Sequence, residues 1–158
     1  MRDPGSHDGH DGHYRRLVAM VGLHFVAMYL LMYVMVDALQ NVYHNFNQVY
    51  MAGLMTASMV LIEIPLMRSM YPKRKLNAVI LGAGAAALLG CYFFVRQQTA
   101  ISDRQFLRSM IPHHAAAILM CKEAPIRDPE ITRLCAEIVA GQQAEINLMK
   151  EILARPGE

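Results

Sequence analysis

A short segment near the C-terminus collects side chains that bind soft metal ions. It reads SMIPHHAAAILMC, residues 109–121, and contains Met110, His113, His114 and Met120. Thioether, imidazole and thiolate groups are the ligands that suit Cu(I). On a helix, steps of three, four or seven residues place these donors on one broad face. The spacing therefore predicts a metal-binding face, although the adjacent histidines point about 100° apart and need not share one ion.

A second group of donors follows in the segment LCAEIVAGQQAEINLM, where Cys135, Gln142, Glu145 and Met149 are related by the same spacing. Two facing helices would bring the two groups together. The alternative is that the methionines are ordinary core residues and that the histidines are solvated or hydrogen-bonded, because Met is also a flexible apolar filler. Spacing alone leaves both interpretations open.

Cys121 and Cys135 flank the connection between these two segments at comparable distances. In an oxidising compartment a disulfide is the simpler interpretation, and closing a loop of this size would contribute about 3 kcal/mol. A pair of thiolates that binds Cu(I) is the alternative. Cys91, in an apolar run, is interpreted as a small apolar residue.

The two segments are predicted to form a helical hairpin. Ser102 and Gln105 form a capping box, which predicts a helix from about residue 103 to 123, bent at Pro112. Asp128 is a good N-cap and Pro129 suits the first helical position, so a second helix should run to about residue 153. One hairpin of this size buries little on its own, and two hairpins from two chains could form a four-helix bundle.

The segments DRQFLRSMIPHHAAAILM and LCAEIVAGQQAEINLM resemble the DUF305 family. That family is marked by an M-I-P-H-H core with a downstream Met, here Met110 to His114 and Met120, and by a later Q-x-x-E-I-x-x-M, here ending at Met149. The resemblance implies a ferritin-like helical module that binds copper in the periplasm. It implies metal ligation by Met110, His113, His114, Met120, Glu145 and Met149. Longer members have more than one hairpin, which favours dimerisation of this chain.

Three apolar runs precede the hairpin, at residues 17–36, 49–67 and 76–95. Each is close to the roughly 20 residues that cross a bilayer as a helix. The chain has 158 residues, of which 54% are hydrophobic and only 18% are charged. We therefore predict an all-α protein: a tail at residues 1–14, a three-helix membrane domain at residues 15–95, and the hairpin at residues 96–158.

The orientation in the membrane is predicted from Lys and Arg in the short loops. Arg15 and Arg16 precede the first run, and residues 68–75 between the second and third runs contain four Lys and Arg residues, whereas residues 37–48 contain none. The N-terminus should therefore be cytoplasmic and the hairpin periplasmic, in a bacterial-type inner membrane. In the third run, Gly82, Ala86 and Gly90 predict close packing against another helix, within the chain or between chains.

Soft donors also recur in the first two apolar runs, mostly at steps of four residues. The donors are Met20, His24, Met28, Met32 and Met35 in the first run, and Met51, Met55, Met59, Glu63 and Met67 in the second. Packing of Met between helices is one explanation. Ionisable residues within a membrane normally have a partner, and we expect His24 and Glu63 to lie at a similar depth and to approach each other or share a water or ion. Met28, Met59 and this pair would then line a pathway for Cu(I).

The N-terminal segment HDGHDGH places His7, His10 and His13 at a spacing of three. We expect it to be a flexible tail. Three imidazoles and two carboxylates could capture Cu(II), Ni(II) or Zn(II) weakly, but a His-rich tail without a structural role is an equal alternative.

These patterns lead to one main hypothesis and two alternatives. The main hypothesis is a membrane-anchored homo-oligomer that binds copper, preferably Cu(I), or another soft metal through the hairpin, for copper tolerance or trafficking. The alternatives are a Cu(I) pathway through the spans and a non-metal anchor with a dimerisation module. A net charge of +2 gives no indication of a nucleic-acid partner. No nucleophile–base arrangement or phosphate loop is apparent, so we do not expect an enzyme.

Overall fold

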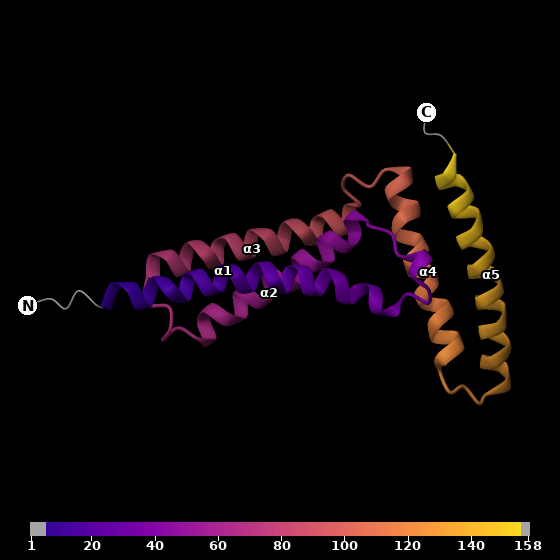
Figure 1. Ribbon diagram of the computed structural model, residues 1–158, viewed down its shortest axis with the longest axis horizontal. Helices are drawn as coiled ribbons and strands as arrows, with labels where there is room; N and C mark the ends of the chain where they lie inside the picture. Colours follow the sequence, from indigo (N-terminus) through magenta and orange to yellow (C-terminus); the bar gives the residue numbers. More distant parts are fainter. Residues whose placement is uncertain (1–5, 156–158) are drawn as a thin grey trace, which may run out of the picture. The chain divides into compact units, whose positions relative to one another are not determined.

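The computed structural model describes residues 6–155, with side chains from Gly12 onward, and every regular element among them is helical. The elements are α1 (Ser6–Leu31), η1 (Met32–Met35), η2 (Leu39–Asn41), α2 (Phe46–Leu66), α3 (Arg74–Gln97), α4 (Asp103–Glu123) and α5 (Pro129–Ala154) (Figure 1). The predicted all-α fold, with three apolar helices followed by a helical pair, is confirmed.

The chain divides into two compact units. Residues 1–31 and 49–99 form the first, called here the three-helix unit, and residues 32–48 and 100–158 form the second, called the hairpin unit. The segment between the first two apolar runs therefore belongs with the C-terminal helices rather than with the spans that it connects.

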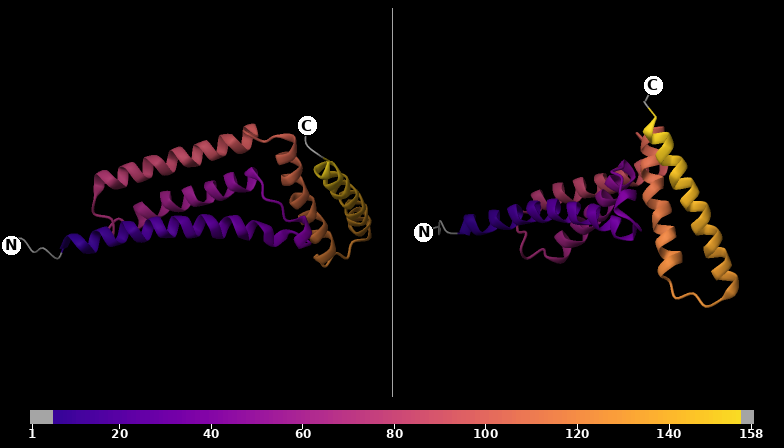
Figure 2. Two further views of the ribbon diagram at one scale, coloured as in Figure 1. Left: turned by 45° about the horizontal axis from the view of Figure 1, so that its top comes forward. Right: turned by 45° about the vertical axis from the view of Figure 1, so that its right-hand side comes forward.

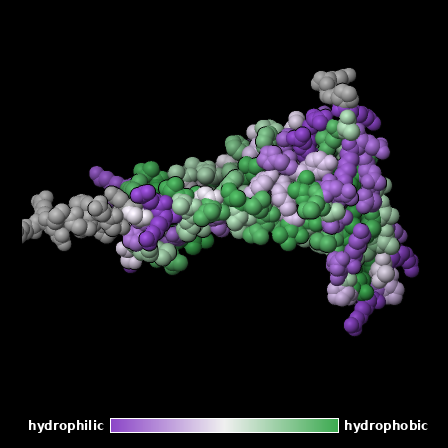
Figure 3. Space-filling view, in the orientation of Figure 1, coloured by the Kyte–Doolittle hydropathy of each residue, from purple (hydrophilic) through white to green (hydrophobic). Residues whose placement is uncertain are grey.

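Each helix of the three-helix unit belongs to a segment long and apolar enough to cross a membrane. The three segments are Gly12–Met35, Phe46–Leu66 and Arg74–Gln97. Large apolar side chains point outward from them, and Val18 is 73% exposed and Ile62 is 64% exposed. In Figure 3 hydrophobic residues extend along most of this unit, with hydrophilic residues at the end where the chain enters α1. Since exposed apolar surface of this extent suits lipid, the three predicted spans are confirmed as candidates by length and composition.

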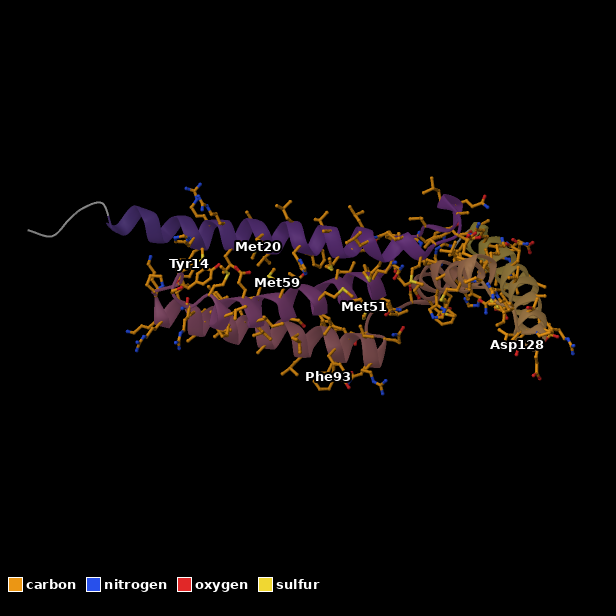
Figure 4. The ribbon with its side chains drawn as sticks, turned by 90° about the horizontal axis from the view of Figure 1, so that it is seen from below. Tyr14, Met20, Met51, Met59, Phe93 and Asp128 are labelled. Carbon is orange, nitrogen blue, oxygen red and sulfur yellow. A yellow bond between two sulfur atoms is a disulfide. The ribbon has the colours of Figure 1, made fainter. Side chains whose placement is uncertain are left out.

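The buried core of the three-helix unit lies at the end that contains the start of α1 and the α2–α3 loop. Tyr14 and Leu17 of α1 cluster with Val60 and Ile64 of α2 and with Tyr71 of the loop. Figure 4 shows Tyr14 at this end, Met20 and Met59 at nearly one level along the unit, and Met51 further along. These contacts set the register of α1 against α2.

Close packing between α2 and α3 involves glycines other than the predicted ones. An added Cβ at Gly53 would lie 2.8 Å from Cys91 Sγ, and one at Gly84 would lie 3.2 Å from Leu61 Cδ2. An added Cβ at Gly82 or Gly90 would meet nothing within 4 Å. Within the chain, the Gly82-based stripe therefore faces away from α2, and its packing between chains stays a prediction.

The helix α1 begins earlier than expected. We predicted a flexible tail over residues 1–14, but the helix starts at Ser6. Gly9 and Gly12 lie within this helix.

In the hairpin unit, α4 and α5 lie side by side and antiparallel (Figure 2). Their ends agree with the capping signals. Ser102 Oγ accepts from Gln105 N at 3.4 Å, and Asp128 accepts from the backbone N–H groups of Glu130 and Ile131. The second half of the capping box is absent because Gln105 Oε1 accepts from Phe46 N at 3.2 Å instead.

The core of the hairpin unit contains residues from α4, from α5 and from residues 32–48, which we call the inter-span segment. Ile111, Ala115, Ile118, Ile146 and Met149 are buried together. Partly buried side chains that pack against them include Val36, Tyr43, Met110 and Leu107. The inter-span segment thus covers one side of the hairpin and helps to hold α4 in place.

Candidate metal site

The centre of the candidate site is His114, in the middle of α4. Its ring is buried, at 8% exposure. Nδ1 lies 2.9 Å from the carbonyl oxygen of Met110, and Nε2 lies 2.7 Å from Glu145 Oε2 on α5. A carbonyl oxygen only accepts hydrogen bonds, so Nδ1 must carry a hydrogen and donate it. This bond fixes the ring orientation and directs Nε2 towards α5.

The contact between His114 and Glu145 joins an imidazole and a carboxylate at the edge of the core. The Glu145 side chain is 58% exposed, so one side of the pair is open to solvent. With Nδ1 already protonated, a second proton must lie between Nε2 and the carboxylate for the 2.7 Å bond to form. A metal ion that binds Nε2 would replace this proton.

His113 differs from His114 although the two are adjacent. His113 is exposed, and its ring centroid lies 6.1 Å from that of His114. The two imidazoles therefore have different environments: the fold fixes the ring of His114, whereas the ring of His113 lies on the surface. The predicted 100° offset between them accounts for this difference.

The three predicted thioether ligands also differ in burial. Met149 is buried in the hairpin core and Met110 packs against that core, whereas Met120 is 52% exposed. Met110 lies one turn before His114 on α4, and Met149 lies one turn after Glu145 on α5. Met110 is therefore one turn from the fixed imidazole on its own helix, Met149 is one turn from the carboxylate that the imidazole contacts, and Met120 lies on the surface.

Cys121 and Cys135 form a disulfide that joins α4 to α5, with their Cα atoms 5.3 Å apart. A disulfide sulfur lacks the charge of a thiolate, so in this state neither cysteine is a thiolate ligand. Among the described residues, no group of three or more His, Cys, Asp or Glu side chains is arranged to hold a metal ion.

A direct bond between His24 and Glu63, one form of the expected pairing, is not found among the described residues. Glu63 Oε1 accepts a hydrogen bond of 2.7 Å from Tyr71 Oη, and within the described part of the chain no hydrogen bond or ion pair joins it to His24. Leu17 clusters with Ile64, so Glu63 is level with the start of the apolar run and His24 lies about two turns further along α1. The expected pairing assumes that the centres of the first two runs lie at the same depth, which this register does not match.

A polar network around Tyr71 was missed by the sequence reasoning. Tyr14 Oη donates to Asn77 Oδ1 at 2.8 Å and accepts from Lys73 N at 3.1 Å, and Asn77 Nδ2 donates to the Tyr71 carbonyl at 2.7 Å. Burial first, then the hydrogen bond to Glu63, raises the pKa of Tyr71 from 10.0 to about 12. The network ties the start of α1 to the α2–α3 loop, and Tyr14 pairs with Lys73 and Asn77, 59 and 63 positions away, which leaves no local signal.

The N-terminal histidines are only partly described. The side chains of His7 and His10 lie outside the described residues, whereas His13 is half-buried and its Nδ1 has no hydrogen-bond partner. Met28 and Met59 are half-buried in the three-helix unit, and Met59 packs against the core cluster at the start of α1. Met59 therefore has a packing role.

Together these features define a class: an all-α protein in which three apolar helices accompany a capped, disulfide-linked helical hairpin with Met and His residues at its centre. Residues 94–153 match DUF305, described as a domain of unknown function. The chain is also 34% identical over 140 residues to the uncharacterized protein L153 of Acanthamoeba polyphaga mimivirus, a match that covers 87% of this chain and 90% of that protein. The chain belongs to the DUF305 family.

The similarity to the mimivirus protein is longer than the family match, so it must extend into the apolar helices. The similarity therefore covers both the apolar helices and the hairpin of this chain. No solved structure matches the chain.

Proposed function

We propose that this protein is a membrane-anchored copper-binding protein for copper tolerance or trafficking, and that the hairpin binds Cu(I) through Met and His side chains. The observation that carries the proposal is the geometry of His114. Its Nδ1–H is bonded to the Met110 carbonyl, which leaves Nε2 as the ligating nitrogen. A ligating imidazole commonly donates its other N–H to a carbonyl or carboxylate in this way.

The side chains around His114 have the chemistry that Cu(I) requires. Met110 lies one turn from His114 on α4, Met149 lies one turn from Glu145 on α5, and His113 and Met120 are exposed on α4. Thioether and imidazole ligands select Cu(I) over hard ions such as Mg²⁺ and Ca²⁺. Glu145, the bonding partner of Nε2, would supply a carboxylate or accept the displaced proton. Other soft or borderline metals would compete for these groups.

The orientation that we propose has the N-terminus in the cytoplasm and the hairpin outside, in a bacterial-type inner membrane. The contacts of Tyr14 with Lys73 and Asn77 bring the start of α1 and the α2–α3 loop to one end of the three-helix unit. Arg15 and Arg16 therefore share that end with the basic residues of the loop, as the positive-inside rule expects of the cytoplasmic end. The disulfide supports an oxidising compartment for the hairpin.

The structure affects the two alternative functions differently. A Cu(I) pathway through the spans has lost its central support, because Glu63 is bonded to Tyr71 rather than close to His24. A non-metal anchor with a dimerisation module remains as an outcome of the test. We propose binding rather than catalysis as the activity.

The test is a Cu(I) titration of the full-length protein in detergent, with ascorbate as the reductant and a chromophoric chelator as the competitor. The variant carries His113→Ala and His114→Ala together, and the matched control carries His24→Ala, which removes an imidazole from the three-helix unit. We expect the parent and the control to bind copper and the double variant to lose it. Unchanged binding by the double variant would exclude the hairpin site. No binding by the parent would favour the anchor.

A further inference from the structure

Each helix of the hairpin carries a second stripe of residues beside the one that holds the hairpin together. In both second stripes the steps alternate between three and four, which is the heptad pattern of a helix–helix seam. We call these residues the outer stripes. On α5 the outer stripe is Ile131, Leu134, Ile138, Gly141, Glu145, Leu148 and Ile152, and on α4 it is Phe106, Met110, His113, Ala117 and Met120.

The outer stripes are apolar but are not covered in the structure. Five of their large side chains are about half exposed: Phe106 50%, Met120 52%, Ile131 48%, Leu134 53% and Leu148 53%. The other three, Met110, Ile138 and Ile152, are partly buried. Glu145 is the only charged residue in either stripe, and its carboxylate is already bonded to His114. A helix that carries two adjacent heptad stripes is suited to contact two neighbouring helices, as in a four-helix bundle.

The two outer stripes lie on the same side of the hairpin. His114 lies about 40° from Met110 of the outer stripe in one direction and about 40° from the buried Ile118 in the other. Its ring reaches Glu145, which belongs to the outer stripe of α5. On the opposite side of α4, Pro112 and Ala115 are buried, and the inter-span segment supplies the cover there. The hairpin therefore has one covered face and one open apolar face.

We propose that the open face packs against the same face of a second copy of this chain, which completes a four-helix bundle and closes the copper site between the two copies. The second part rests on the proposed function. The five half-exposed side chains offer about 100 Å² each, so a symmetric pair would bury about 1,000 Å² from them alone. With the smaller residues of the stripes added, the contact reaches the range of about 1,200–2,000 Å² of a stable interface.

The residues that flank the open face argue against a membrane surface as its occupant. A helix that lies on a bilayer usually carries Lys and Arg beside its apolar stripe. Here the exposed residues beside the α5 outer stripe include Glu130 and Glu137. A regular heptad with small residues near its centre suits a helical partner better than lipid.

The centre of the open face contains the residues that a second copy would share. The disulfide places Cys121 level with Cys135, and the His114–Glu145 bond fixes a second level, so Ala117 lies close to the level of Gly141. A Cβ added at Gly141 would meet nothing within 4 Å, so there is room for a close approach. His113 and Glu145 each lie four residues, about 6 Å along the helix, from this level. A two-fold axis through the level would therefore place one His113–Glu145 pair on either side of it, and each pair would face the open face of the other copy.

The experiment measures the mass of copper-free, full-length protein in detergent by light scattering, and then its Cu(I) affinity. One variant carries Leu134→Glu with Leu148→Glu, in the outer stripe, and the matched control carries Ala144→Glu with Asn147→Glu, which adds the same charge on the outward side of α5. We expect the parent and the control to be dimers and the stripe variant to have half the protein mass. Its Cu(I) affinity should fall roughly tenfold or more although every ligand is retained.

A second pair of variants tests the interface without added charge, in case the Leu134→Glu, Leu148→Glu variant misfolds. In a Cys91→Ala background, Gly141→Cys should give disulfide-linked dimers on mild oxidation, and Ala144→Cys should not. A monomeric parent, or equal cross-linking at positions 141 and 144, would overturn the interface. A dimeric parent whose monomeric variant binds Cu(I) equally well would overturn the shared site. A dimeric parent that binds no copper would instead refute the proposed function and leave the interface standing.

Discussion

The adjacent histidines of α4 allow a prediction in which each serves as the control for the other. His114 is buried and bonded through both nitrogens, whereas His113 is exposed. In the copper-free protein, His114→Ala should therefore destabilise the hairpin and His113→Ala should not. Both substitutions should weaken Cu(I) binding, so stability and binding separate within one pair of variants.

The size of the effect follows from what each ring contacts. Removing the His114 ring from a site with 8% exposure loses transfer and cavity terms of about 2 kcal/mol. The bond to the Met110 carbonyl contributes about 1 kcal/mol. The bond to Glu145 contributes less than that, because the carboxylate is 58% exposed and screened by water. We expect a loss of about 3 kcal/mol for His114→Ala and less than about 0.5 kcal/mol for His113→Ala.

Amide hydrogen exchange on full-length, copper-free protein in detergent is the suitable assay, since it reports α4 and α5 separately from the three-helix unit. The protected amides of the hairpin core, around Ile118 and Ile146, should exchange roughly a hundredfold faster in His114→Ala if opening of the hairpin limits exchange. Equal effects of the two substitutions, or a larger effect of His113→Ala, would refute the reasoning. Glu145→Gln should have an intermediate, smaller effect, because Nε2 keeps a hydrogen-bond partner of the same shape.

Three further predictions concern other parts of the structure. Cys121→Ala should lower the stability of the hairpin by about 3 kcal/mol in a denaturant titration, because it opens the loop that the disulfide closes, whereas Cys91→Ala should have little effect. The unfolding free energy of the three-helix unit should fall as the pH rises from 10.0 to about 12, since the folded Tyr71 holds its proton more strongly than the unfolded one; Tyr71→Phe should abolish this fall. Gly53→Ala, whose Cβ would lie 2.8 Å from a cysteine Sγ, should lower the thermal unfolding midpoint, and Gly82→Ala, with nothing within 4 Å, should not.

The local features of the fold were predictable because their causes are local. Ser102 and Asp128 cap the helices that they precede, and the apolar runs correspond to the three long helices. The side chain of a short polar residue either finds a free N–H within three residues or does not, so the sequence alone is sufficient. The disulfide also has a local signal, because Cys121 and Cys135 lie at comparable distances on either side of the connection between the two helices.

Features that depend on the register between helices were not predictable in this way. A shift of a few residues between α1 and α2 decides whether Glu63 meets His24 or Tyr71, and hydropathy is almost uniform along both runs. The small-residue pattern failed for a related reason. Several faces of α3 carry Gly or Ala, and only the packed structure selects Gly84 rather than Gly82.

The structure also changes how the HisHis motif is understood. Two histidines at adjacent positions on a helix cannot have the same environment, because about 100° separates them. In this hairpin His114 faces the core edge and His113 faces the open side. A site built from the pair would combine one ligand that the fold holds ready with one that must be positioned on binding. The open apolar face around His113 offers a means of positioning it, because packing against a second hairpin would exclude water and restrict that ring.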